Sequence, residues 1–148
     1  MTESNIFFCG IGGSGMLPLA SIVRATGAKV AGSDRSLDAG RVANKFAYLR
    51  SLGIALFPQD GSGLQPGMTL VTSAAVEETV PDVVRARELG LQHLTRPQFL
   101  AKLLNDAQRS VAVGGTSGKS TVTGMIGWIL HAAHRQATVM DGAVMKNF

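Results

Sequence analysis

The chain has 148 residues, of which 45% are hydrophobic and 16% are charged, so it is globular and not disordered. This length provides the core of one ordinary α/β domain and part of a second. The net charge of +4 comes from basic residues scattered along the chain, without a basic run or interleaved aromatic residues, and we therefore expect no nucleic-acid partner.

The cysteine content and the apolar stretches indicate the compartment. Cys9 is the single cysteine, so it cannot form an internal disulfide, which fits a reducing compartment. Its apolar neighbours predict a buried thiol and not a reactive one. No apolar stretch reaches membrane-spanning length, and the polar N-terminus lacks the basic region of a signal peptide. We expect a cytoplasmic protein with no membrane partner.

Up to about residue 106, short apolar runs alternate with segments of helical periodicity. The runs are continuously apolar, which is typical of strands that are buried on both faces, and glycines stand where the helices should end. This alternation predicts an α/β fold with a Rossmann-like, doubly wound parallel sheet, in which ligands bind beyond the carboxyl ends of the strands. The expected strands are 6–9, 29–32, 54–57, 69–72 and 91–94, and the expected helices are 14–26, 40–52, 81–89 and 97–104.

The first glycine-rich turn, in the stretch FFCGIGGSGM, directly follows the first expected strand. Its spacing, Gly10-x-Gly12-x-x-Gly15, lets the backbone approach a diphosphate at the N-terminus of a helix. Asp34 ends the second expected strand about 20 residues further on, where a dinucleotide-binding domain has its acidic residue. These residues alone are therefore compatible with an NAD-binding Rossmann domain of an oxidoreductase.

After residue 106 the pattern restarts with an expected strand at 110–113, a helix at 122–133 and a further strand at 137–140. We therefore predict two domains, 1–106 and 107–148, the second being the first strand, phosphate loop and helix of a truncated P-loop domain. The loop reads GGTSGKST and departs from the usual P-loop spelling, because Val113 stands six residues before Lys119, where a glycine is usual. In such a loop the lysine reaches the terminal phosphates and the next hydroxyl, here that of Ser120, binds Mg²⁺.

A resemblance to a known family follows from six segments in chain order: GIGGSGM, VAGSD, LVTSAAV, RARELG, RPQFLAKLL and AVGGTSGKSTVT. Together they resemble the Mur ligase family, the ATP-dependent amide-forming enzymes of peptidoglycan synthesis. The likeness covers nearly the whole chain and is strongest to members that use UDP-N-acetylmuramate. It implies a UDP-sugar site formed by Gly12, Gly13, Ser14, Gly15, Met16, Asp34, Ser73 and Ala74. It also implies an ATP site, with Lys119 as the catalytic residue and Ser120 as the metal ligand, formed by Gly115, Thr116, Ser117, Gly118, Lys119, Ser120 and Thr121.

The resemblance implies that the chain is the UDP-N-acetylmuramate- and ATP-binding portion of a carboxylate–amine ligase, with ATP and Mg²⁺ as cofactors. In the family reaction, a substrate carboxylate attacks the γ-phosphate of ATP, and the amine of an amino acid or peptide then displaces phosphate from the acyl phosphate. Family members continue into a fuller ATPase domain and an amine-binding domain. We therefore expect no ligation by this chain alone, and ATP- and amine-dependent phosphate release by the purified chain would contradict this.

Alternatives remain open for the whole chain and for single residues. Besides the NAD-binding reading, the chain could be a non-catalytic nucleotide-binding module derived from such a ligase. Asp34 could cap a turn, Ser73 could be a turn residue, and Met16 could belong to the core. Three segments depart from the family pattern: Ser117 stands where histidine is common, Pro58-Gln59 stands where Gly-His is common, and the tail MDGAVMKNF matches the expected strand and glycine pair only loosely.

Overall fold

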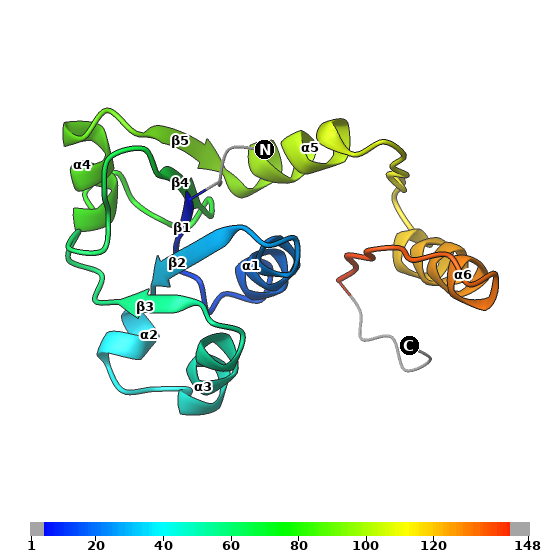
Figure 1. Cartoon of the computed structure of the whole chain (residues 1–148), viewed down its shortest axis with the longest axis horizontal. Coiled ribbons are helices and arrows are strands. Elements are labelled where there is room, and N and C mark those ends of the chain that lie inside the picture. Colours follow the sequence, from blue (N-terminus) through cyan, green and yellow to red (C-terminus); the bar gives the residue numbers. More distant parts are fainter. Residues whose placement is uncertain (1–4, 143–148) are drawn as a thin grey trace. The chain divides into compact units, whose positions relative to one another are not determined.

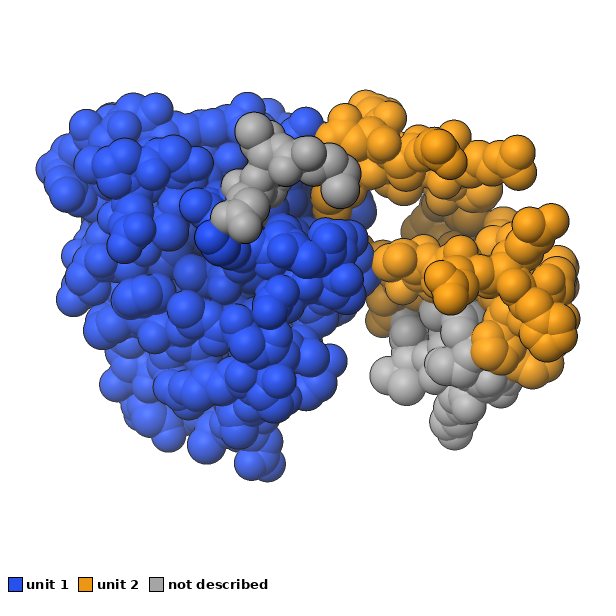
Figure 2. Space-filling model, in the orientation of Figure 1, with its two compact units in different colours: residues 1–102 blue, residues 103–148 orange. Residues whose placement is uncertain are grey.

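A computed structural model describes residues 5–142 of the chain. The chain separates into two compact units, residues 1–102 and residues 103–148, which Figure 2 shows in different colours and which are called unit 1 and unit 2. The division falls four residues before the expected boundary at residue 106, inside a helix. The assignment of the two parts to separate nucleotide-binding domains stays a prediction, and residues 143–148 of the expected second domain lie outside the described residues.

Unit 1 is built on a five-stranded, all-parallel sheet with the strand order β3-β2-β1-β4-β5 (Figure 1). The predicted α/β fold with a doubly wound sheet is therefore confirmed. The chain moves outward from β1 to β3, then crosses to the other side of β1, so the strand order reverses between β1 and β4. The strands are β1 (Asn5–Cys9), β2 (Lys29–Ser33), β3 (Ala55–Phe57), β4 (Thr69–Thr72) and β5 (Gln92–Thr95).

Five helices connect or follow these strands, and four of them were predicted. The helix expected from residue 40 begins three residues later, because Val42 adopts a left-handed backbone conformation (φ 56°) that a helix cannot contain. Val42 is 50% exposed and lies outside the core. The helices are α1 (Met16–Ala25), α2 (Arg35–Asp38), α3 (Ala43–Ser51), α4 (Pro81–Glu88) and α5 (Arg96–Asp106).

The core lies on both faces of this sheet, with α4 on one side and α1 and α5 on the other (Figure 1). On the α4 side, Phe7 packs with Leu70 and Val83 in one buried cluster. On the other side, the ring of Phe8 meets that of Phe99 edge-on, with centroids 5.7 Å apart. Burial on both faces explains why β1 is continuously apolar.

Gly32 in β2 is required because the backbone of β1 approaches it closely. A Cβ on Gly32 would lie 2.5 Å from the carbonyl oxygen of Phe8 and 2.8 Å from Cδ1 of Ile11, distances that no side chain accommodates without movement of β1. The end of β2 is therefore pressed against the start of the glycine-rich turn. This contact places the residues after β2 beside that turn.

Unit 2 contains the predicted helix, α6 (Lys119–Ala132), but not the predicted strands. Residues 110–113 and 137–140 are irregular, and the described part of this unit contains no strand. The apolar pattern of these residues is typical of strands, but a parallel strand requires neighbouring strands for its hydrogen bonds. Two strands alone are only marginally stable. Those two strand predictions are wrong for this chain, and Val111 is left 66% exposed.

Among residues 5–142, no helix is both long enough and apolar enough to cross a membrane.

Candidate functional site

The carboxyl ends of three adjacent strands meet where the strand order reverses. Cys9, the last residue of β1, is in register with Ser33 of β2 and with Thr72 of β4. The residues that follow these strands must therefore lie at one edge of the sheet. This arrangement brings the glycine-rich turn, Asp34 and Ser73 together, although they are far apart in the sequence.

The glycine-rich turn is bound to the end of β2 by its first two amides. The amides of Gly10 and Ile11 both donate to the carbonyl oxygen of Ser33, at 2.9 and 3.0 Å. Gly10 has a φ of +78°, a conformation that favours glycine, and its carbonyl accepts from the amide of Gly13 at 3.1 Å. The chain thereby reverses direction within a few residues and enters α1 at Met16.

Most amides of this turn are already paired within the protein, and two are not. The amides of Met16 and Leu17 donate to the carbonyl oxygen of Gly13, as the first turn of α1 requires. The amides of Ser14 and Gly15 have no acceptor among the described residues. Unpaired amides at the start of a helix attract an anion, so the turn is a candidate anion site with two donors.

The carboxylate of Asp34 holds this turn from the side of β2. One oxygen, Oδ2, accepts from the amide of Gly12 at 2.8 Å, and the other, Oδ1, accepts from the amide of Ser36 at 2.7 Å. Asp34 is therefore the N-cap of α2, which explains a helix that hydrophobic periodicity did not predict. Asp34 is only 8% exposed, so its carboxylate positions the turn as well as bordering the site.

A small cavity of about 130 Å³ lies beside Asp34. Lys45 reaches it from α3, and its Nζ donates to the carbonyl oxygen of Gly12 at 3.3 Å. The left-handed Val42 also borders this cavity, and backbone strain of this kind is concentrated at functional sites. The lining residues are Gly12, Gly13, Asp34, Ser36, Val42, Lys45 and Phe46.

The remaining residues expected at the UDP-sugar site occupy different environments. Met16 is 2% exposed, so its side chain belongs to the core of unit 1. Ser73 opens a turn after β4, and its carbonyl accepts from the amide of Val76 at 3.1 Å. A Cβ on Gly10 would lie 3.9 Å from Cγ2 of Val76, so this turn borders the glycine-rich turn. Ala74 is exposed in the same turn.

A buried polar cluster lies behind the site. Asp82, which is fully buried in the first turn of α4, accepts from the hydroxyl of Ser33 and from the amide of Gly61, the latter at 2.8 Å. Burial raises the pKa of Asp82 above its ordinary value, while these two hydrogen bonds oppose the rise. Because Ser33 also anchors the glycine-rich turn, Asp82 supports that turn through the end of β2.

The same cluster makes Cys9 unreactive. Burial raises the pKa of the Cys9 thiol to about 12, with the charge of Asp82 as the next cause. At pH 8 the thiolate fraction is therefore about one in ten thousand. We expect the folded chain to react with a thiol reagent such as Ellman's reagent at least a hundredfold more slowly than the chain in guanidinium chloride. Equal rates would show that Cys9 is accessible and ionised.

The second glycine-rich loop lies in unit 2 and precedes α6. Gly115 (φ +147°) and Gly118 (φ +76°) adopt conformations that favour glycine, and Gly118 is the N-cap of α6. The Nζ of Lys119 folds back over the loop and donates to the carbonyl oxygens of Gly115 at 2.8 Å and Thr116 at 3.4 Å. The expected residues 115–121 thus form one exposed loop and the first turn of a helix.

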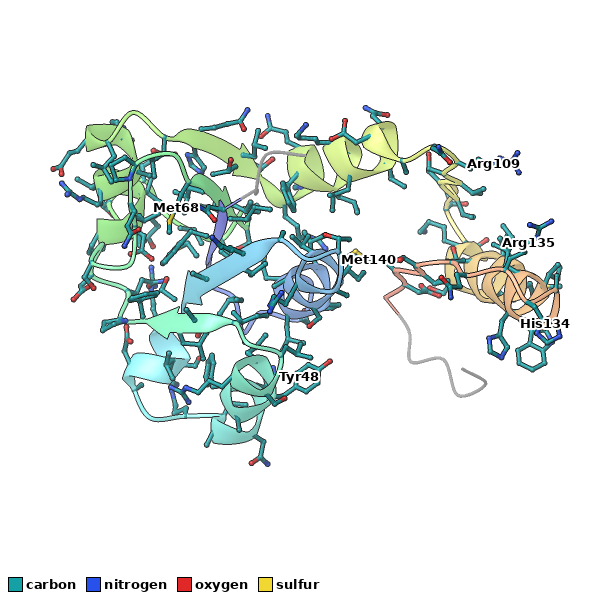
Figure 3. The ribbon with its side chains drawn as sticks, viewed as in Figure 1. Tyr48, Met68, Arg109, His134, Arg135 and Met140 are labelled. Carbon is teal, nitrogen blue, oxygen red and sulfur yellow. The ribbon has the colours of Figure 1, made fainter. Side chains whose placement is uncertain are left out.

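A larger hollow of about 610 Å³ lies at the opposite end of α6, where His134 and Arg135 follow the helix (Figure 3). The C-terminal end of a helix carries the negative end of its dipole, so this hollow is the less suitable of the two ends for a phosphate. Lys119 and the glycine-rich loop at the N-terminal end remain the candidate phosphate site.

Sequence reasoning did not single out three residues that the structure places at or behind the first site: Lys45, Arg96 and Asp82. Lys45 and Asp82 lie within helices that showed only core periodicity. Arg96 directly follows β5, at the same edge of the sheet as the glycine-rich turn. Its position after a parallel strand was the one signal that could have identified it.

Comparison with known proteins matches residues 5–108 to the model of the Mur ligase family, catalytic domain. The chain is 36% identical over 144 residues to a UDP-N-acetylmuramate–L-alanine ligase of Brucella ovis, covering 97% of the chain and 29% of that protein. A ligase of the same name from Caldicellulosiruptor bescii is 35% identical over 141 residues. The chain therefore spans about 29–30% of the length of these relatives.

Solved structures agree with these relatives. UDP-N-acetylmuramate-alanine ligase MurC from Thermotoga maritima superposes with a TM-score of 0.80 at 31% identity, over 95% of this chain and 32% of that one. The UDP-N-acetylmuramate:L-alanyl-gamma-D-glutamyl-meso-diaminopimelate ligase from Neisseria meningitides has the same TM-score at 28% identity, over 99% of this chain and 45% of that one. The fold, the family match and the sequence identity agree, and the chain belongs to the Mur ligase family.

Proposed function

We propose that the chain is the nucleotide-binding portion of an ATP-dependent ligase that joins an amine to UDP-N-acetylmuramate in peptidoglycan synthesis. The observation that carries this proposal is the presence of two separate phosphate-type loops in one chain, one in each unit. A hydride-transfer enzyme needs only the first of them. We place this activity in the cytoplasm, which suits the unpaired Cys9, and we propose an amino acid or peptide as the amine partner.

In this proposal, the UDP-sugar lies on the glycine-rich turn of unit 1. The unpaired amides of Ser14 and Gly15 donate to a phosphate, while Asp34 and Ser33 hold the turn in shape from behind. Ser73 and Ala74 border the turn from the end of β4. Because Met16 is buried, it supports the turn from the core and does not contact the sugar.

ATP lies on the loop of unit 2, at residues 115–121. The backbone of this loop and the N-terminal end of α6 surround its phosphates, and Lys119 neutralises the charge that develops on the γ-phosphate during transfer. For this Lys119 must exchange its hydrogen bonds to Gly115 and Thr116 for bonds to phosphate oxygens.

The residues present fit a Mg²⁺ ion that is bound chiefly by ATP. Ser120, in the first turn of α6, would supply a hydroxyl ligand, and the described residues contain no cluster of three or more side chains that could hold a metal. The other ligands would therefore be phosphate oxygens and water, as is usual for Mg²⁺. The ion would orient the phosphates and offset their charge.

The test is a set of calorimetric titrations of the chain with UDP-N-acetylmuramate, NAD and Mg-ATP. We expect binding of the UDP-sugar and of Mg-ATP, each unaffected by saturation with the other, and no binding of NAD. Binding of NAD without binding of the UDP-sugar would overturn the proposal in favour of an oxidoreductase domain.

We expect the Lys119→Ala variant to bind Mg-ATP at least tenfold more weakly and UDP-N-acetylmuramate with unchanged affinity, because a charge-assisted contact to phosphate is lost. Arg109→Ala, which removes the same charge from unit 2 (Figure 3), is the matched control and should leave both affinities unchanged. Loss of both ligands in the Lys119 variant would contradict two separate sites.

A further inference from the structure

We propose that Arg96 binds the diphosphate of the nucleotide held on the glycine-rich turn, which deepens the proposed function and rests on it. Arg96 is the first residue of α5 and directly follows β5. The carboxyl ends of β1, β4 and β5 lie at one edge of the parallel sheet, so Arg96 reaches the turn from the side opposite to Asp34.

The guanidinium group of Arg96 lies directly against the backbone of Gly15. A Cβ on Gly15 would be 2.5 Å from Nη1 and 3.0 Å from Cζ of Arg96, so the group occupies the space that any side chain at position 15 would fill. Gly15, the last glycine of the turn, thus makes room for a cation, in addition to permitting the turn. This cation lies beside the amide of Gly15, one of the two unpaired amides.

Arg96 has no carboxylate within 4.0 Å among residues 5–142, and no hydrogen bond pairs its guanidinium group there. A half-buried guanidinium group without an acidic partner is unusual, because its charge is partly removed from water without compensation. An anion on the turn would provide that compensation. The guanidinium group of Arg96 presents a fork of N–H groups, which suits the paired oxygens of a phosphate.

Lys45 complements Arg96 on the other side of the turn. Its Nζ lies 3.3 Å from the carbonyl oxygen of Gly12, at the opposite end of the turn from Gly15. The carboxylate of Asp34 is occupied by two backbone amides and is largely buried, so the ligand meets the two cations and the free amides. This arrangement matches a doubly negative diphosphate and not an uncharged nucleoside.

The test compares UDP with uridine, because the two probes differ only in the diphosphate. We expect Arg96→Ala to weaken UDP binding to the full chain about ten- to hundredfold, the range for a charge-assisted contact, and to leave uridine binding unchanged. Arg96→Lys should recover part of the loss. Arg50→Ala, which removes an exposed charge from the far end of α3, is the matched control and should bind both probes as the wild-type chain does.

Three outcomes would overturn the role of Arg96: unchanged UDP binding in Arg96→Ala, an equal loss for UDP and uridine, or an equal loss in Arg50→Ala. An equal loss for both probes would mean that Arg96 only supports the shape of the turn. If the wild-type chain binds NAD and not UDP, the proposed function fails, and the comparison of NAD with adenosine then tests Arg96 separately. If the wild-type chain binds no diphosphate, both proposals are overturned.

Discussion

Replacing Asp82 with alanine is expected to lower the free energy of unfolding by about 3 kcal/mol, the largest effect that we predict. Asp82 is fully buried, and its removal leaves the hydroxyl of Ser33 and the amide of Gly61 without an acceptor. Because Ser33 anchors the glycine-rich turn, affinity for the UDP-sugar should fall as well. Urea unfolding followed by far-UV circular dichroism measures the first effect, and calorimetry measures the second.

Asp82→Asn is the matched variant, and it should cost less than about 1 kcal/mol. An asparagine oxygen can accept from the amide of Gly61, and the asparagine NH₂ can donate to the hydroxyl oxygen of Ser33. The same pairs are thereby kept without a buried charge. If the alanine and asparagine variants lose equal stability, the hydrogen-bond explanation is wrong and the charge itself is required.

The pH dependence of stability provides a second measurement of Asp82. Burial raises its pKa in the folded chain above the ordinary value of 3.8, so the folded state holds this proton more tightly than the unfolded state does. The stabilising contribution of the protonated group is fully present below pH 3.8 and is lost as the pH rises through the folded pKa. Asp82→Asn should therefore gain stability relative to the wild-type chain as the pH rises from 3 to 7. A constant difference would contradict this.

Asp34→Asn is expected to lower the free energy of unfolding by about 2 kcal/mol and the affinity for UDP-N-acetylmuramate at least tenfold. Unlike Asp82, Asp34 accepts from two backbone amides, those of Gly12 and Ser36. Asparagine has one oxygen, which can keep the N-cap of α2, but its NH₂ group then faces the amide of Gly12, donor against donor. The glycine-rich turn therefore loses its hydrogen bond to residue 34, while the N-cap of α2 is retained.

The control for this variant is Asp38→Asn, which removes a neighbouring exposed charge that accepts from the amide of Gln59, at 3.1 Å. We expect it to bind the UDP-sugar with unchanged affinity. If both variants weaken binding equally, the general loss of negative charge is responsible. If Asp34→Asn binds and unfolds as the wild-type chain does, the turn does not depend on Asp34.

Asp82 and Asp34 both hold the glycine-rich turn at the end of β2. Asp82 acts through Ser33, the last residue of β2, and Asp34 is the residue that follows it. Asp82 holds the hydroxyl of Ser33, whose carbonyl accepts from the amides of Gly10 and Ile11, and Asp34 holds the amide of Gly12. Three consecutive amides of the turn are therefore oriented by β2. In this arrangement the amides of Ser14 and Gly15 are left for the proposed ligand.

The sequence by itself determined most of the elements of unit 1 and indicated which two loops are candidate sites. The five strands and four of the five helices were predicted because a short apolar run, a helical period and a terminal glycine are local signals. β4 was predicted at its observed bounds, Thr69–Thr72. The lysine in a glycine-rich loop likewise predicts a phosphate site by residue type and spacing alone.

Only the tertiary structure decided which side chains serve the first site. The glycine-rich turn acquires Asp34, Lys45 and Arg96 from three different elements, because the parallel register brings the carboxyl ends of the strands together. The tertiary structure also shows that residues 110–113 and 137–140 do not form strands. Such strands need partner strands, which the described part of unit 2 does not contain. Both results depend on contacts between distant residues, which periodicity and composition do not encode.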